Sequence, residues 1–372
     1  MKKLLGIILI FSSLVFAQVP QQKPLTQAEY VKMLYGLQAN PSTKQDLISA
    51  IRKRGLDFKL TRGLRRLTIS KSKNDAELRR TLEEANRRRA NPTASKLPSE
   101  LEAEEIIEKT RKNTLEAVKE MPDFVVKQRI KRSAAFAGTN NFRSRDRLIV
   151  AVSYLSSGQE KYKILSKNGV LQDNPRSKSD YSELGGTSST GEFVTVLAKT
   201  FKPESETKFE LVDTDVIRKR RAVIFNYSIK KDKAKQLITA SGYITDSTIT
   251  GAKGRIWIDR SNFRVLRLEN IATEIPAGFP IRSAQRVVNY DWVKINQETY
   301  LLPYLSDVRL TFRQGKRLFE SRNLIHFKDY NKYGSEVIIL DDDNEDITEE
   351  SANKPPELID SNKSPKLEKP KP

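Results

Sequence analysis

Along its central and C-terminal part, this chain repeats apolar residues with the two-residue period of β-strands. From Asp123 to about Leu340, alternating segments such as "RLIVAVSYL" and "RAVIFNYSIKK" are separated by short turns. Successive strands joined by short turns are typical of an antiparallel meander. In several of these segments, both the odd-numbered and the even-numbered positions are apolar, so both faces of the strand are apolar. A sheet with one solvent-exposed face needs only one apolar face. Either both faces of the predicted sheet are therefore covered, or one of them lines a cavity.

The segment "GRIWIDRSNFRVLRLE" (254–269) shows this alternation on both sides of a short polar break, and it predicts a hairpin. The face expected to belong to the core is formed by Ile256, Ile258, Leu266 and Leu268. Trp257 and Val265 keep the opposite face partly apolar. This second face is the reason to ask whether the sheet has a ligand-binding side.

The preceding part of the chain has helical patterns. Residues 25–89 predict a small helical domain, which begins at a capping box formed by Thr26 and Glu29. A basic, Pro- and Ser-containing linker follows at 90–98. The region 99–340 then opens with an amphipathic helix, whose apolar stripe predicts that it covers the sheet. We therefore expect an α+β fold, with a helical domain followed by an antiparallel sheet covered by helices.

The two ends of the chain differ from this folded part. Residues 1–17 combine two lysines with a short apolar run and a small residue, Ala17, which is typical of a secretory signal peptide cleaved after that alanine. An uncleaved membrane anchor is the alternative, but the run is short for the ~20 residues that span a bilayer. Residues 341–372 are acidic, then rich in Pro and Lys, which predicts disorder. We expect a periplasmic or secreted protein.

The composition limits the possible chemistry. Cysteine is absent, so disulfides, a lipoprotein anchor and cysteine-ligated metals are excluded. His326 is the only histidine, and its strand pattern favours a structural role. Asp213, Asp215 and Asp259 are acidic residues in strand segments, but a third ligand or a flanking histidine is lacking. We therefore expect no catalytic residues, no metal site and no cofactor, and we interpret the chain as a non-enzyme.

The charge indicates anionic partners. With 67 Lys and Arg against 47 Asp and Glu the formal charge is +20, and loss of Lys2 and Lys3 leaves 20 − 2 = +18. Such a chain is attracted to acidic surfaces, although the charge also keeps a protein soluble. The basic run predicted to contact anionic head groups is Arg218, Lys219, Arg220 and Arg221. A turn that blunts a sheet edge is the alternative. Nucleic acid is not expected as a partner of an exported protein.

Two further groups of residues are candidates for ligand binding. Apolar side chains that could line a cavity are Trp257, Val265, Phe225, Tyr227 and Trp292. A mobile lid is suggested by a glycine-rich loop that leads into a short helix, "GEFVTVLAKTF". Its candidate residues are Gly185, Gly186, Gly191, Phe193, Leu197 and Phe201. A packed core and a flexible capped turn are the respective alternatives.

The chain resembles a known group of envelope proteins over about residues 100–335. The helix before the sheet, the 254–269 hairpin and "RLTFRQGKRLFESRNLIHFKDY" are similar to the lipoprotein-sorting LolA-type and LppX/RseB-like proteins. The resemblance implies a half-barrel sheet around a helix-lidded apolar cavity. The segments "MPDFVVKQ", "LGGTSSTGEF" and "IPAGFPI" resemble a set of secreted bacterial proteins of unassigned activity. The segment "LISAIRKRGLDFKLT" resembles a small helical module of exported proteins.

Two functions are consistent with these patterns. In the first, an exported binding protein holds a lipid, an acyl chain of a lipoprotein or an apolar peptide inside the half-barrel. Apolar burial at about 25 cal/mol per Å² would supply the affinity. In the second, the sheet has a solid core without a ligand, and the chain is a cell-envelope scaffold whose residues 25–89 bind an envelope protein. A sheet interior filled by its own side chains would contradict the first hypothesis.

Overall fold

A computed structural model describes residues 23–172, 193, 195–240 and 245–334. The predicted signal peptide (1–17), the predicted disordered tail (341–372) and the three glycines of the predicted lid, Gly185, Gly186 and Gly191, lie outside the described residues. Within the described ranges, no helix is both long enough and apolar enough to cross a membrane.

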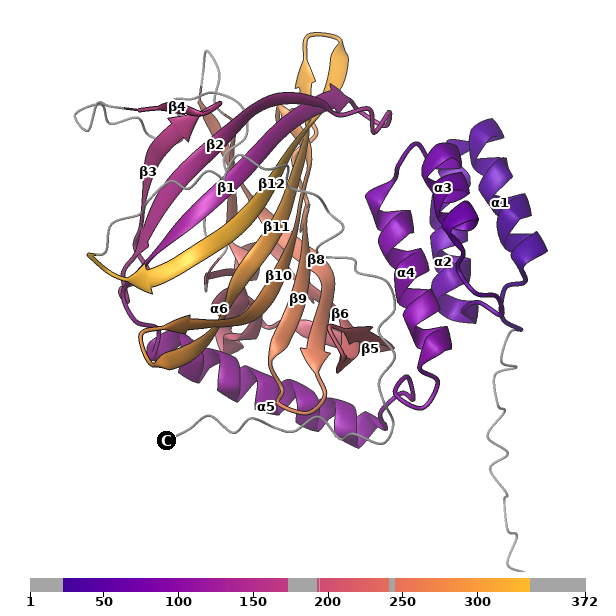
Figure 1. Ribbon diagram of the computed structural model, residues 1–372, viewed down its shortest axis with the longest axis horizontal. Helices are drawn as coiled ribbons and strands as arrows, with labels where there is room; N and C mark the ends of the chain where they lie inside the picture. Colours follow the sequence, from indigo (N-terminus) through magenta and orange to yellow (C-terminus); the bar gives the residue numbers. More distant parts are fainter. Residues whose placement is uncertain (1–22, 173–192, 194, 241–244, 335–372) are drawn as a thin grey trace, which may run out of the picture.

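The N-terminal helices form a module with a core of its own (Figure 1). The elements are α1 (Gln27–Ala39), the 3-10 helix η1 (Pro41–Thr43), α2 (Lys44–Arg54), α3 (Arg62–Lys71) and α4 (Ala76–Ala90). The capping box predicted from Thr26 and Glu29 is present at the start of α1. Leucines and isoleucines from all four α-helices meet in the core, and Leu25 joins them through a bridge to Leu56.

The remaining chain forms one large antiparallel sheet that is not closed, together with helices. Its strands are β1 (Phe124–Phe136), β2 (Arg143–Tyr154), β3 (Glu160–Lys167), β4 (Val170–Leu171), β5 (Lys208–Ile217), β6 (Arg220–Ile229), β7 (Gln236–Ala240), β8 (Asp246–Asp259), β9 (Val265–Thr273), β10 (Ile281–Ile295), β11 (Glu298–Gln314) and β12 (Arg317–Lys332). The helices of this part are α5 (Glu100–Lys119), α6 (Thr195–Phe201), η2 (Pro203–Ser205) and α7 (Lys231–Ala234).

The strand order departs from a simple meander. It runs β4-β3-β2-β1-β12-β11-β10-β9-β8-β6-β5, and β7 pairs only with β8. The first strand therefore lies beside the last, with Ile130 opposite Ile325. Between β4 and β5 the chain passes from one edge of the sheet to the other, and α6 lies on this connection. A sequence pattern of strands and turns does not reveal this crossover, because it depends on pairing between distant segments.

The sheet has an inner face, which carries Phe225, Ile256 and Leu268 and is covered by α5 and α6. Ile106 of α5 and Phe201 of α6 pack directly into the same cluster. The other, outer face carries Trp257 and faces the helical module. Figure 1 shows α5 along one end of the sheet and the module beside β8 and β9. Both faces are therefore covered at β6, β8 and β9, which is one of the two alternatives that the apolar residues at both odd-numbered and even-numbered positions left open.

In the β8–β9 hairpin, Val265 and Leu266 lie on the opposite faces from those that the sequence pattern predicts. Residues directly opposite each other in antiparallel strands share a face, and Ile256 lies opposite Leu268 as expected. A register shift after Trp257 then places Val265 opposite Ile258. Val265 is consequently on the inner face, whereas Leu266 packs with Trp257 on the outer face. The swap arises because a bulge reverses the alternation of a strand.

Candidate functional site

The helical module is attached to the outer face of the sheet by buried ion pairs from α4. Arg87 donates to Asp215 through Nε at 2.7 Å and through Nη2 at 2.9 Å. The same carboxylate accepts a hydrogen bond of 3.1 Å from Trp257 Nε1. The Asp215 side chain is fully buried, and that of Arg87 is 6% exposed. This bidentate geometry fixes both the position and the orientation of α4 on the strands.

Glu84, one turn earlier on α4, is the centre of the next ion pair. Arg255 Nη1 donates to its carboxylate at 3.0 Å, and Arg267 Nη1 lies 4.0 Å from it. Burial alone would raise the pKa of Glu84, but Arg255, Arg52, Arg87 and Arg267 together lower it to about 2. Glu84 is therefore ionised at any physiological pH, and the contact between module and sheet is strongly polar.

Asp213 is a third carboxylate that pairs with α4, and its pKa is raised. Arg88 Nη1 lies 2.7 Å from its Oδ2. Burial raises the pKa of Asp213 to about 6, and the opposing effect of Arg88 is too small to restore the ordinary value. This carboxyl group therefore titrates near pH 6.

We expect Asp213 to make the folded state less stable as pH rises from 4 to 6. Its pKa in the folded state is above the ordinary 3.8, so the folded state binds more protons in this window and loses stability as they leave. Urea unfolding at several pH values checks this against Asp213→Asn, whose stability should fall less over the same range. Parallel pH profiles for the two chains would contradict it.

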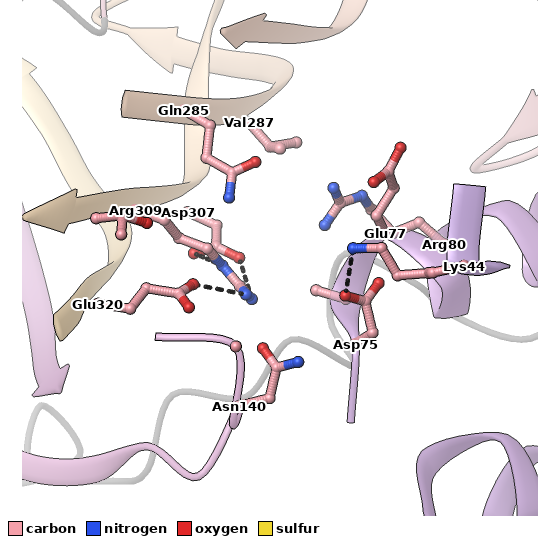
Figure 2. A pocket seen from close by; sticks show the side chains of 13 residues that line it. Lys44, Asp75, Glu77, Arg80, Asn140, Gln285, Val287, Asp307, Arg309 and Glu320 are labelled. Atoms are coloured by element: carbon pink, nitrogen blue, oxygen red, sulfur yellow. Dashed lines mark hydrogen bonds and ion pairs between the residues drawn. The ribbon is translucent and has the colours of Figure 1, made fainter. Parts of the chain in front are cut away.

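A polar cleft opens where the module meets β10, β11 and β12, and its volume is about 180 Å³ (Figure 2). Its lining residues are Lys44, Asp75, Ala76, Glu77, Arg80, Gly138, Asn140, Gln285, Val287, Asp307, Arg309, Thr311 and Glu320. Figure 2 shows two facing walls, with Lys44 and Asp75 on the module side and Arg309 between Asp307 and Glu320 on the sheet side. Each wall therefore presents both signs of charge.

On the sheet wall of the cleft, Asp307 is bound by two arginines. Arg322 holds Asp307 in two hydrogen bonds of 2.9 and 3.0 Å, and Arg309 adds weaker ones of 3.3 and 3.4 Å. Burial would raise the pKa of Asp307, but Arg309, Arg322 and Arg80 hold it well below its usual range. For Glu320, burial raises the pKa, and the nearby Arg309 offsets only part of this, while Asp307 and Asp75 raise it further. The wall thus offers one fixed anion and one carboxyl group that protonates readily.

The module wall contributes three further ion pairs. Lys44 Nζ lies 3.0 Å from Asp75 Oδ2. Arg80 Nε lies 3.3 Å from Glu269 Oε1 on β9. Glu77 pairs with Arg52 at 3.4 Å, a long contact between partly exposed side chains. A charged ligand group could replace the contact between Glu77 and Arg52 at little cost, because ion pairs near the surface contribute only about 0–1 kcal/mol.

The residues predicted to line a cavity do not share one face. Phe225, Tyr227 and Val265 belong to the buried cluster of the inner face. Trp257 lies on the outer face, where Arg255 and Arg267 stack over its ring at 4.7 and 5.3 Å. Trp292 is half-buried and lies opposite Leu301. Trp257 therefore lies on the opposite face of the sheet from Phe225, Tyr227 and Val265.

The described members of the predicted lid are core residues. Phe193 packs edge-on against Phe124 and Phe327, with ring centroids 5.4 and 5.6 Å apart. Leu197 and Phe201 of α6 are buried in the inner-face cluster. These three side chains are therefore part of the buried clusters on the inner face.

The predicted head-group site does not present four free cations. Arg218 donates to the carbonyl of Tyr290 at 2.5 Å and lies 3.3 Å from Asp291. Arg220 lies 3.1 Å from Asp259. Only Lys219 and Arg221 of this set are exposed. The turn is a two-residue connection in which Arg218 and Lys219 both have positive φ. Asp291 and Asp259 pair with two of the four cations of this set and so neutralise half of its charge.

The acidic residues considered as catalytic or metal-binding candidates form ion pairs. Asp213, Asp215 and Asp259 each lie beside an arginine. Burial lowers the pKa of His326, with help from Lys328 and Arg129. In the part of the chain that the structure describes, no three His, Asp or Glu side chains are grouped to hold a metal ion.

Sequence reasoning missed the cleft because its walls come from segments far apart in the chain. A usable signal was nevertheless present within the strands. Arg255, Arg267, Asp307 and Arg309 are charged, yet they lie in strands among apolar residues. Charges at such positions are almost never fully buried unless they are paired. They therefore indicate polar partners on the outer face. For Arg255 and Arg267 the partner is Glu84 of α4, and for Asp307 and Arg309 the partners are Arg322 and Glu320 of β12.

Comparisons with known proteins give only weak likenesses. No family model matches the chain, and no curated protein matches it. A DUF1329 family protein from Desulfovibrio piger overlays with a TM-score of 0.27 at 9% identity, covering 62% of this chain and 95% of that one. MucB from the MucA/MucB complex of Pseudomonas aeruginosa gives 0.17 at 9% identity, covering 59% and 93%. Such low TM-scores do not establish a shared fold, so the LolA-type resemblance stays a prediction.

Proposed function

We propose that this chain is an exported, non-enzymatic binding protein that holds a segment of a polypeptide partner in the polar cleft. The cleft between module and sheet is the observation that carries this proposal, because its two walls face each other with both signs of charge (Figure 2). Sites between domains are a common location for ligands. The partner segment would carry charged side chains of its own, which pair with Lys44 and replace the long contact between Glu77 and Arg52.

The size and chemistry of the cleft support a polypeptide segment over a free lipid. Its volume of about 180 Å³ is below the ~300–1,000 Å³ of small-molecule pockets and suits one or two side chains of a partner. Ala76 and Val287 are its only aliphatic lining residues, so an acyl chain would gain little by entering. Ile271 lies directly opposite Gln285 and is exposed, which gives a partner an apolar contact beside the cleft.

Site-specific photo-crosslinking in the exporting cell tests this proposal. A photoreactive residue replaces Gln285, which is exposed and lines the cleft. We expect a light-dependent adduct with one discrete envelope polypeptide, and we expect the adduct to weaken at high salt because screening reduces charge attraction. The matched control places the same residue at Lys294, an exposed position of the same strand outside the cleft.

A blocking variant separates binding in the cleft from mere proximity to it. Gln285→Trp should fill the cleft, so the polypeptide identified by crosslinking should no longer co-purify with this variant. The same polypeptide should co-purify with Lys294→Trp as it does with the original chain. Equal adducts from both positions, or retention of the partner by Gln285→Trp, would show that the cleft is not the binding site.

An apolar ligand inside the half-barrel is a second candidate, favoured by one observation. The side chains of Gln128 and Ser306 are fully buried on the inner face, and neither forms a hydrogen bond with any described residue. A buried polar group without a partner costs about 1–3 kcal/mol, so a ligand head group there would be stabilised. Native mass spectrometry of the purified chain tests this, and a chain that carries no bound lipid would exclude it.

A further inference from the structure

We propose that the end of the sheet formed by the β1–β2, β11–β12 and pre-β10 loops docks on an anionic lipid bilayer. This surface, called the basic tip below, is formed by residues 136–145, 276–282 and 312–319. Figure 1 shows the β11–β12 hairpin projecting beside the end of β1. The proposal does not rest on the polar cleft, with which the basic tip shares Gly138 and Asn140.

The three segments of the basic tip form one continuous surface. Phe136 lies opposite Phe319, and Phe319 lies opposite Phe312. The backbone N–H of Ala137 donates to the carbonyl of Leu318, and that of Arg313 donates to Pro280, both at 3.0 Å. Loops that are distant in the sequence are thus tied together by strand pairing and by hydrogen bonds.

The charge of the basic tip is of one sign. Its sequences, "FAGTNNFRSR", "PAGFPIR" and "FRQGKRLF", contain no Asp or Glu. Five exposed cations, Arg143, Arg145, Arg313, Lys316 and Arg317, form no ion pair with the described part of the chain. Lysines and arginines near an anionic membrane surface are attracted to its head groups.

The same surface exposes apolar side chains beside these cations. Phe136 is 51% exposed and Leu318 is 41% exposed. The ring of Phe136 is held by Phe319, at a centroid distance of 5.0 Å, and by Arg317, whose Cζ lies 5.8 Å from it. Aromatic and aliphatic side chains bordered by basic ones suit the boundary between head groups and acyl chains. A soluble polyanion would use the cations but gain nothing from Leu318.

Vesicle binding of the full chain tests the proposal. The probes are phosphatidylcholine vesicles with and without 30% phosphatidylglycerol. We expect binding only to the anionic vesicles, and we expect it to weaken as salt rises. The triple variant Arg313→Gln, Lys316→Gln, Arg317→Gln should bind about a hundredfold more weakly, because each basic residue near such a surface strengthens binding about fivefold.

A matched triple variant controls for net charge. Lys59, Arg62 and Arg66 are exposed cations of the helical module, and changing all three to Gln lowers the charge by the same amount. This control should bind the anionic vesicles like the original chain. Equal losses in the two triple variants would overturn the proposal, because they would show a general charge effect.

Leu318→Ser distinguishes a bilayer from a soluble polyanion. Its side chain is exposed, so the fold should tolerate the change, which circular dichroism checks. We expect severalfold weaker binding to anionic vesicles and unchanged binding to heparin. If Leu318→Ser binds the vesicles as tightly as the original chain, or if soluble heparin displaces the chain from vesicles at equal charge concentration, the surface binds acidic polymers and the proposal fails.

Discussion

Changing Asp215 to Asn is expected to lower the free energy of unfolding by about 3–5 kcal/mol, the range for removing one partner of a buried ion pair. The change leaves the guanidinium of Arg87 buried with a neutral partner, while the shape of the site is preserved. The chain holds two tryptophans, so in a Trp292→Phe background Trp257 alone reports the transition. Its Nε1 donates to the altered group, and its emission spectrum should therefore shift as well.

The double variant Arg87→Met, Asp215→Asn provides the control. Methionine removes the unpaired charge and keeps an apolar body in its place, so the double variant should be more stable than Asp215→Asn alone. A cost for Asp215→Asn within about 0.5 kcal/mol, the usual range for surface changes, would show that this pair does not hold α4 on the sheet.

Changing Gly254 to Ala is expected to destabilise the chain by about 3 kcal/mol, the upper end of the range for overpacking. A Cβ atom at this position would lie 1.8 Å from the backbone oxygen of Glu269 and 2.7 Å from its carbonyl carbon. Both atoms belong to the neighbouring strand β9, so no side-chain rotation can relieve the overlap. Urea unfolding followed by circular dichroism measures the loss.

Gly36→Ala is the matched control for the Gly254 variant. Gly36 lies inside α1, and a Cβ atom there would meet no other atom within 4 Å. Alanine is preferred to glycine in a helix, so this change should stabilise the chain by about 0.5–1 kcal/mol. If Gly254→Ala were as well tolerated as Gly36→Ala, then β8 and β9 would not approach as closely as the structure shows.

The elements that depend on local patterns could be predicted from the sequence. The Thr26 and Glu29 capping box marks the start of α1 because both partners lie within four residues. The two-residue period identifies the strands for the same reason. The register shift at Trp257 was missed because a bulge leaves the composition of a strand unchanged. It exchanged the faces of Val265 and Leu266.

The attachment of α4 could not be predicted, because its contacts cross most of the chain. The sequence predicts that Glu84 and Arg87 lie on the solvent-exposed face of an amphipathic helix, because Leu78, Leu82 and Ala85 already form its apolar stripe. In the structure both faces of α4 are buried, one by the module core and the other by arginines and aspartates of the sheet. Nothing in the local sequence specifies Arg255 as the partner of Glu84.

The pairing of β1 with β12 has a consequence for how the chain reaches its native state. Contacts such as Ile130 with Ile325 join residues near opposite ends of the sheet sequence, and proteins rich in such non-local contacts fold slowly. Until β12 is available, β1 has a free edge that can pair with another chain and cause aggregation. A C-terminal truncation within β12 should therefore lower the yield of soluble protein far more than a truncation after Tyr333.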